Sequence, residues 1–140
     1  MKILLPVDGS EHSARVARHA VRLAQSCASY EFLLLNVQEP IDAPELRGHM
    51  PAREIEAMQE ARGGDAMAAA RALLDAAGVA YVPEVTLGPV AASITRIAGE
   101  RRCDAIVMGS HGAGAIANAL MGSVTAEVIR HTPCPVTVVK

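Results

Sequence analysis

The chain has 140 residues, of which 51% are hydrophobic and 20% are charged, and its formal net charge is −2. This length and apolar content predict one globular domain over residues 1–140 rather than a disordered chain. The small negative charge argues against a general nucleic-acid binder, and one Phe, two Tyr and no Trp leave little aromatic surface for stacking bases.

The cysteine pattern and the hydropathy bear on where the protein works. The three cysteines are scattered and form no C-x-x-C pair, which suits a reducing cytosol. No apolar stretch approaches the length of a membrane span. We therefore expect a cytoplasmic protein with no membrane partner.

The first 37 residues predict a strand, a helix and a second strand. The apolar run 3–7 is typical of a buried parallel strand, and Asp8-Gly9-Ser10 ends it. Ser10 is placed to cap a helix whose apolar residues recur at helical spacing from Val16 to Cys27. A second apolar run follows at 32–37. This order indicates a right-handed βαβ unit.

The middle of the chain alternates in the same way after a long loop. Residues 39–53 hold three prolines and no clear period, which predicts a surface loop. Residues 54–77 favour a helix, which Gly63-Gly64 is expected to bend or break. Residues 81–87 predict a strand that Pro83 places at a sheet edge, and Pro89 opens the next helix.

The C-terminal third predicts a strand, a glycine-rich stretch, a helix and a last strand. The strand at 104–108 leads into glycines at 109, 112, 114 and 122, and a helix follows over 123–131. The last strand, 135–139, begins with Pro135, which again favours a sheet edge.

This alternation predicts an α/β fold, a three-layer doubly wound sandwich around a five-stranded parallel sheet. Such sheets usually have the strand order 3-2-1-4-5 or 2-1-3-4-5, and ligands bind where the order reverses, beyond the carboxyl ends of the strands. In the first order, residues 6–10 and 109–112 face the same cleft.

The glycine-rich stretch has the layout of a phosphate site. Glycine lets the backbone approach an anion closely, and the N-terminus of the following helix offers unpaired N–H groups. The stretch is not a Walker loop, because the chain has no Gly-Lys-Ser/Thr. It is not the dinucleotide fingerprint either, because that pattern follows a first strand.

Two long motifs resemble those of the universal stress protein family. One is Gly109-x2-Gly112-x9-Gly122-Ser123, with the strand before it and the segment 124–136 after it. The other is the N-terminal segment 3–10, ILLPVDGS. The resemblance covers residues 2–139 apart from the proline-rich loop, and it implies the order 3-2-1-4-5 and a homodimer.

The resemblance also implies a stress-response regulatory protein that binds ATP, with Mg²⁺ present only with the nucleotide. Asp8 would contact the ribose, where a carboxylate can accept two hydroxyl hydrogens. The remaining implied nucleotide-binding residues are Pro6, Val7 and Val37 at the adenine, Gly109, His111 and Gly112 along the phosphates, Gly122, Ser123 and Val124 at the outer phosphates, and Met108.

One departure from the family pattern leaves a second reading open. Family loops commonly carry basic residues after the second glycine, whereas here no Lys or Arg lies between Arg102 and Arg130. The alternative is a dimeric interaction module of the same family that does not bind nucleotide. Two of the residues also have simpler structural interpretations. Asp8 would cap the first helix, and His111 would be an exposed loop residue.

The sequence gives still less support to the hypothesis that the protein is an enzyme. The sequence supplies no clear general base and no fixed metal site, so we assign no catalytic residue and expect at most slow ATP hydrolysis.

The C-terminal strand gives a physical reason for dimerisation. Val136, Thr137, Val138 and Val139 form an apolar strand at an expected sheet edge, which invites pairing with another chain. Two such strands related by a two-fold axis would make an isologous homodimer. The sequence identifies no other protein partner.

Overall fold

The computed structural model of the chain describes residues 1–41, 48–112 and 121–140. Five parallel strands form one sheet in the order β3-β2-β1-β4-β5. Their bounds are β1 Lys2–Pro6, β2 Glu31–Gln38, β3 Tyr81–Leu87, β4 Ala105–Gly109 and β5 Val136–Val139. The α/β class and the order 3-2-1-4-5 are therefore confirmed, and the two strands expected at edges, β3 and β5, lie there.

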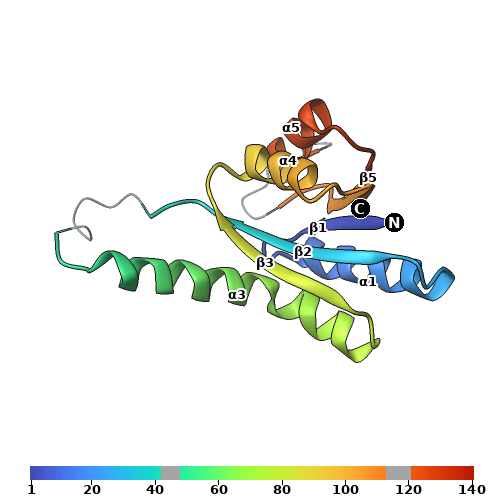
Figure 1. Cartoon of the computed structure of the whole chain (residues 1–140), viewed down its shortest axis with the longest axis horizontal. Coiled ribbons are helices and arrows are strands. Elements are labelled where there is room, and N and C mark those ends of the chain that lie inside the picture. The colour runs from blue at the N-terminus through green and yellow to red at the C-terminus, as the bar shows by residue number, and fades with distance from the viewer. Residues whose placement is uncertain (42–47, 113–120) are drawn as a thin grey trace.

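Helices cover both faces of this sheet (Figure 1). Helices α1 (Glu11–Ser26) and α3 (Ala52–Ala76) pack on one face, where Val16, Ala20 and Leu74 meet Leu5 and Leu34. Helices α4 (Val90–Glu100) and α5 (Ser123–His131) pack on the other face, over Leu4, Leu35 and Ile106. Because both faces are buried, the central strands are apolar at successive positions instead of alternating.

The two central strands, β1 and β4, pair over only a short length. Their register joins Ile3 to Ala105 and Leu4 to Ile106, and the pairing stops there although both strands continue. The Lys2 carbonyl accepts from the Asp104 N–H, and the Lys2 N–H donates to the Asp104 carboxylate, so alternate residues of β1 turn their backbone groups toward β4. The next donor in that alternation is residue 6, and proline has no N–H. The hydrogen-bonded ladder between the two strands therefore ends before Pro6, at the carboxyl end of the sheet.

Helix α3 runs without a break through the glycine pair expected to bend it (Figure 1). Gly63 is buried on the side of α3 that meets β3, and a Cβ there would lie 2.7 Å from Val85 Cγ2. Gly64, one residue later, has open space around the same position. The expected break is absent, and Gly63 instead serves close helix–sheet packing, which a local propensity does not reveal.

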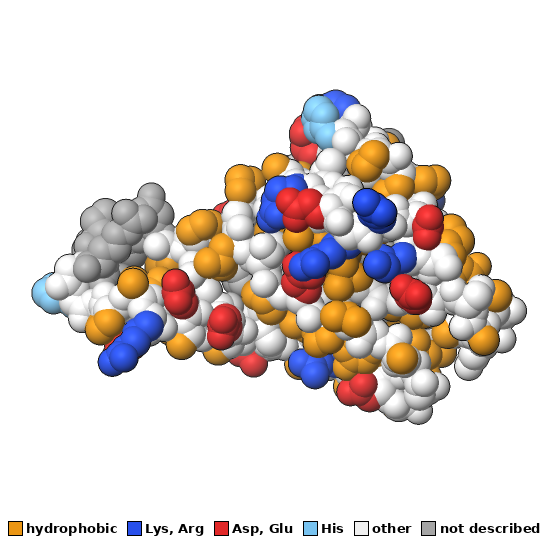
Figure 2. Space-filling model, viewed as in Figure 1, with side chains coloured by type: hydrophobic (Ala, Val, Ile, Leu, Met, Phe, Trp, Pro, Cys, Tyr) orange, Lys and Arg blue, Asp and Glu red, His pale blue; other side chains and the backbone are white. Residues whose placement is uncertain are grey.

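Acidic and basic side chains are interspersed on the face seen in Figure 2. Arg101 pairs with Glu84 at 3.0 Å, and Arg96 pairs with Glu100 at 2.9 Å one turn along α4. Among the described residues, no helix is both long enough and apolar enough to cross a bilayer.

The two glycines of α3 give a matched pair of substitutions. We expect Gly63→Ala to lower the free energy of unfolding by about 1–3 kcal/mol, because the added methyl overlaps Val85. Gly64→Ala should instead raise it by about 0.5–1 kcal/mol through helix propensity. Urea unfolding followed by circular dichroism measures both, and equal effects of the two changes would contradict this account of the packing.

Candidate functional site

A cavity of about 320 Å³ opens at the carboxyl ends of the strands, where β1 and β4 part. A volume of this size is in the range of small-molecule sites, and the place is the switch point of the sheet. All eleven residues that the family motifs singled out line this cavity: Pro6, Val7, Asp8, Val37, Met108, Gly109, His111, Gly112, Gly122, Ser123 and Val124.

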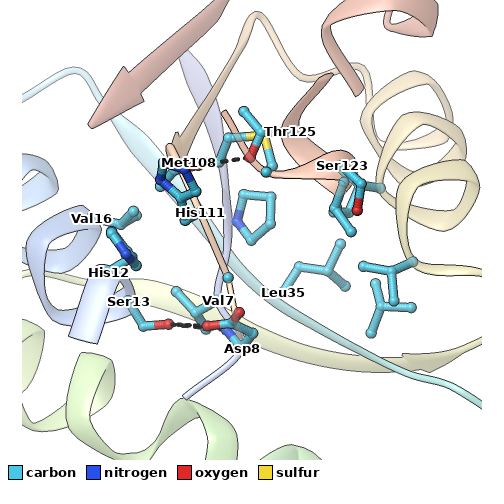
Figure 3. Close-up of a pocket in the computed structure, with 18 of the residues that line it drawn as sticks. Val7, Asp8, His12, Ser13, Val16, Leu35, Met108, His111, Ser123 and Thr125 are labelled. Atoms are coloured by element: carbon cyan, nitrogen blue, oxygen red, sulfur yellow. Dashed lines mark hydrogen bonds between the residues drawn. The ribbon is translucent and has the colours of Figure 1, made fainter. Parts of the chain in front are cut away.

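Asp8 stands at the floor of the cavity as Figure 3 shows it, joined to α1 by hydrogen bonds. Its Oδ1 accepts from the Ser10 N–H at 3.0 Å and from the Ser13 hydroxyl at 3.1 Å. The Ser13 oxygen in turn accepts from the N–H groups of Asp8 and Gly9. The turn between β1 and α1 is thus fixed by Asp8 and Ser13. Ser10 holds the N-cap position, but its hydroxyl makes no capping hydrogen bond, contrary to expectation.

A buried amide secures the other side of Asp8. Asn36, 2% exposed, donates from Nδ2 to the Val7 carbonyl at 2.8 Å, and its Oδ1 accepts from Gln38 Nε2 at 2.7 Å. The Val7 N–H donates to the Leu35 carbonyl at 2.8 Å. Both backbone groups of Val7 are therefore engaged within the protein. A ligand beside Val7 would meet its side chain and the remaining lone pair of its carbonyl.

The turn after β4 is tied to two other elements. The Gly122 N–H donates to the Ser110 carbonyl at 2.7 Å, and the Ser110 N–H donates to the Val139 carbonyl at 3.0 Å. The Thr125 hydroxyl donates to the Gly109 carbonyl at 2.9 Å. These bonds hold the start of α5 against the end of β4. Residues 113–120, part of the stretch without basic residues, lie outside the described part.

Gly112 lies against the carboxylate of Asp8 in the lining of the cavity. A Cβ at position 112 would collide with Asp8 Oδ2, so no larger residue fits there without moving that carboxylate. The first and the fourth strand thus bring an acceptor and a glycine turn into contact across about a hundred residues of sequence.

One wall of the cavity is apolar. Leu35 and Val37 from β2, Val90 and Ile94 from α4, and Val124 from α5 line it, with the buried Met108 beside them. Apolar walls with a few convergent polar groups are typical of sites for small organic ligands.

Four further polar residues line the cavity that the sequence did not single out: His12, Ser13, Glu39 and Thr125. His12 and Ser13 lie four and five residues after Asp8, at the first turn of a helix that starts beside the site, and that spacing was the available signal. The charged or titratable lining residues among those described are Asp8, Glu39, His12 and His111, with no Lys or Arg.

The family model of the universal stress proteins matches residues 1–140 of this chain. The chain belongs to the universal stress protein family. A universal stress protein of Methanocaldococcus jannaschii is 30% identical over 99% of this chain and 81% of its own length. A relative from Thermus aquaticus is 33% identical over 99% of this chain and 97% of its own.

Solved structures of universal stress proteins have the same fold. UspA of Lactobacillus plantarum superimposes with a TM-score of 0.83 at 24% identity, covering all of this chain and 97% of that one. A universal stress protein solved in complex with cAMP gives 0.74, and one from Arabidopsis thaliana with AMP bound gives 0.71, both at 22% identity over the whole of this chain and 97% and 91% of theirs.

Asn36 allows a test of how the site is held. Asn36→Leu keeps the size of the side chain but leaves the Val7 carbonyl without its buried donor. We expect it to lower the free energy of unfolding by about 1–3 kcal/mol. Gln38→Ala removes only the outer, half-buried partner and should cost less. Denaturant titration ranks the two, and the reverse order would contradict the role given to Asn36.

Proposed function

We propose that this universal stress protein binds ATP in the cavity between β1 and β4 and acts as a regulatory homodimer in the cell's response to stress. The observation that carries the proposal is the contact of Asp8 Oδ2 with the glycine turn at Gly112, inside a cavity that all eleven motif residues line. An acidic acceptor and a backbone turn at one switch point suit a ribose next to a phosphate chain.

The separate walls of the cavity suit the separate parts of a nucleotide. The apolar wall around Val37 and Met108 can hold the adenine ring, and Asp8 can accept from the ribose hydroxyls. Ser123 and the first N–H groups of α5 can donate to phosphate oxygens. The relatives solved with cAMP and AMP support adenine as the base, and a third, from Archaeoglobus fulgidus, was solved with dAMP.

The lack of fixed cations decides how a triphosphate would be neutralised. Asp8 and Glu39 add negative charge, and no described lining residue is Lys or Arg. Mg²⁺ bound with the nucleotide can bridge the outer phosphates and offset that charge. We place Mg²⁺ with the ligand, since the described residues contain no cluster of three candidate metal ligands.

The same charge pattern favours a second candidate function, an interaction module that binds no nucleotide. Under that reading the cavity would be filled by the protein's own apolar side chains. Met121, one residue considered for that role, does not line the cavity and is 38% exposed; the other, Leu120, lies outside the described residues. Nucleotide bound to the freshly purified protein would exclude this alternative.

The homodimer proposal rests on β5. The carbonyls of Pro135 and Val139 accept from β4, so the backbone groups of the alternate residues, Val136 and Val138, point away from the sheet. They form the unpaired edge of a short apolar strand, the kind of edge that pairs with a second copy.

Equilibrium binding of ATP to the purified protein, with Mg²⁺, tests the nucleotide proposal. We expect Asp8→Ala to weaken ATP binding about 10- to 150-fold, which corresponds to about 1.5–3 kcal/mol for hydrogen bonds to a charged group. Asp8→Asn, which keeps one acceptor oxygen for Ser10 and Ser13, should lose less.

Asp104→Asn is the matched control, because Asp104 is exposed and accepts from Lys2 at the opposite end of the sheet. It should leave ATP affinity unchanged. Absence of binding to the wild-type protein at millimolar ATP would overturn the proposal.

Val138→Pro tests the dimer. The substitution removes an N–H that faces away from β4, so it should convert a dimer to a monomer at micromolar concentration while leaving the sheet intact. Val138→Thr keeps the N–H and should stay dimeric. Sedimentation velocity reads out both variants, and a monomeric wild type would refute the proposal.

A further inference from the structure

Two histidines meet at the end of the cavity formed by Gly109 and Gly112. His12 comes from the first turn of α1, and His111 comes from the turn after β4. Their ring centroids are 5.7 Å apart, and the ring planes are inclined by 39°. Figure 3 shows them next to one another, across the cavity from Ser123.

Close packing determines where the two rings lie. A Cβ at Gly109 would come within 2.7 Å of His12 Cβ, so the glycine at the end of β4 leaves the room that His12 occupies. His111 Nδ1 lies 3.0 Å from the Ser110 hydroxyl. His12 Nδ1 is buried and has no hydrogen-bond partner within the described part of the chain. His12 Nδ1 therefore has no hydrogen bond, within the described residues, that would fix the tautomer or the charge of the ring.

The charged groups around this pair come from three elements. Asp8 and Glu39 line the same cavity after β1 and β2. Glu11 precedes His12 on α1, and the guanidinium of Arg15 lies 3.7 Å from the carboxylate of Glu11. Helices α4 and α5 contribute only uncharged described residues to the lining, Val90, Ile94, Ser123, Val124 and Thr125. The imidazoles are therefore the only described lining groups that can become positive.

We propose that His12 and His111 form a protonatable clamp for the phosphate groups of the nucleotide, so that the protein binds ATP more tightly in slightly acidic than in slightly alkaline solution. This inference rests on the proposed function, since it assigns the phosphates to this end of the cavity. The pair takes the place of the basic residues that this chain lacks between Arg102 and Arg130.

The direction of the pH effect follows from the charges. Two imidazolium groups 5.7 Å apart would repel one another, and the anionic phosphates would offset that repulsion. A phosphate chain between them and α5 favours protonation, so binding takes up protons. Imidazole titrates near neutral pH, and raising the pH through that range removes the charge and weakens binding.

Binding of ATP without added Mg²⁺, measured at pH 6 and pH 8, tests the clamp. We expect the wild type to bind ATP about tenfold more tightly at pH 6, as uptake of about half a proton over this range predicts. The double variant His12→Gln/His111→Gln should lose this preference. The pH dependence that remains in the double variant measures the effect of titrating the ATP phosphates themselves. His19→Gln, on α1 but outside the cavity lining, is the matched control and should behave as wild type.

Adenosine, which has no phosphate, separates the two proposals. It should bind wild type and double variant equally at both pH values. If ATP and adenosine both bind but ATP affinity has the same pH dependence in wild type and double variant, the clamp is refuted and the nucleotide site stands. If neither ligand binds the wild type, both proposals fail.

A second measurement needs no variant. Calorimetry of ATP binding to the wild type at pH 8, in two buffers of different ionisation enthalpy, should show net proton uptake. The phosphates are already deprotonated at this pH, so the protons taken up can be assigned to the protein. Zero uptake or net release would overturn the clamp even if the double variant failed to fold.

Discussion

The reversal of strand order between β1 and β4 is the constraint on which the site depends, and the missing N–H of Pro6 lies at the same place. A central pair of parallel strands normally continues its ladder to the end of both strands, and here the ladder stops after Leu4 and Ile106. The strands part at the place where the sheet order reverses, and the cavity occupies the opening. The missing donor and the reversal of strand order therefore coincide at this cavity.

Around that opening, side-chain hydrogen bonds hold the neighbouring turns in place. Asn36 holds the Val7 carbonyl, Ser13 holds the turn at Asp8, and Thr125 holds the Gly109 carbonyl. Each bond joins an element on one side of the cavity to its neighbour in the fold. These bonds place the carboxylate of Asp8 against the glycine turn at Gly112 before any ligand is present.

The sequence predicted the fold well because its signals are local and repeated. Apolar runs, helical spacing and terminal prolines located every described strand and helix, and the family motifs located eleven residues that line one cavity. Gly63 shows where this reasoning fails, because its packing partner Val85 is distant in sequence. His12 and Asn36 were missed for a related reason: each looks like an ordinary helix or strand residue until β4 and Val7 are placed beside it.

The bond from the Ser110 N–H to the Val139 carbonyl also has a consequence for folding order. The turn that carries His111 and Gly112 is anchored by β5, which follows every other described element in the chain. A nascent chain that already contains β1 to β4 can form most of the sheet before this anchor exists. Ligand binding would then report that β5 has joined the sheet, and it would stabilise only chains that have completed this step.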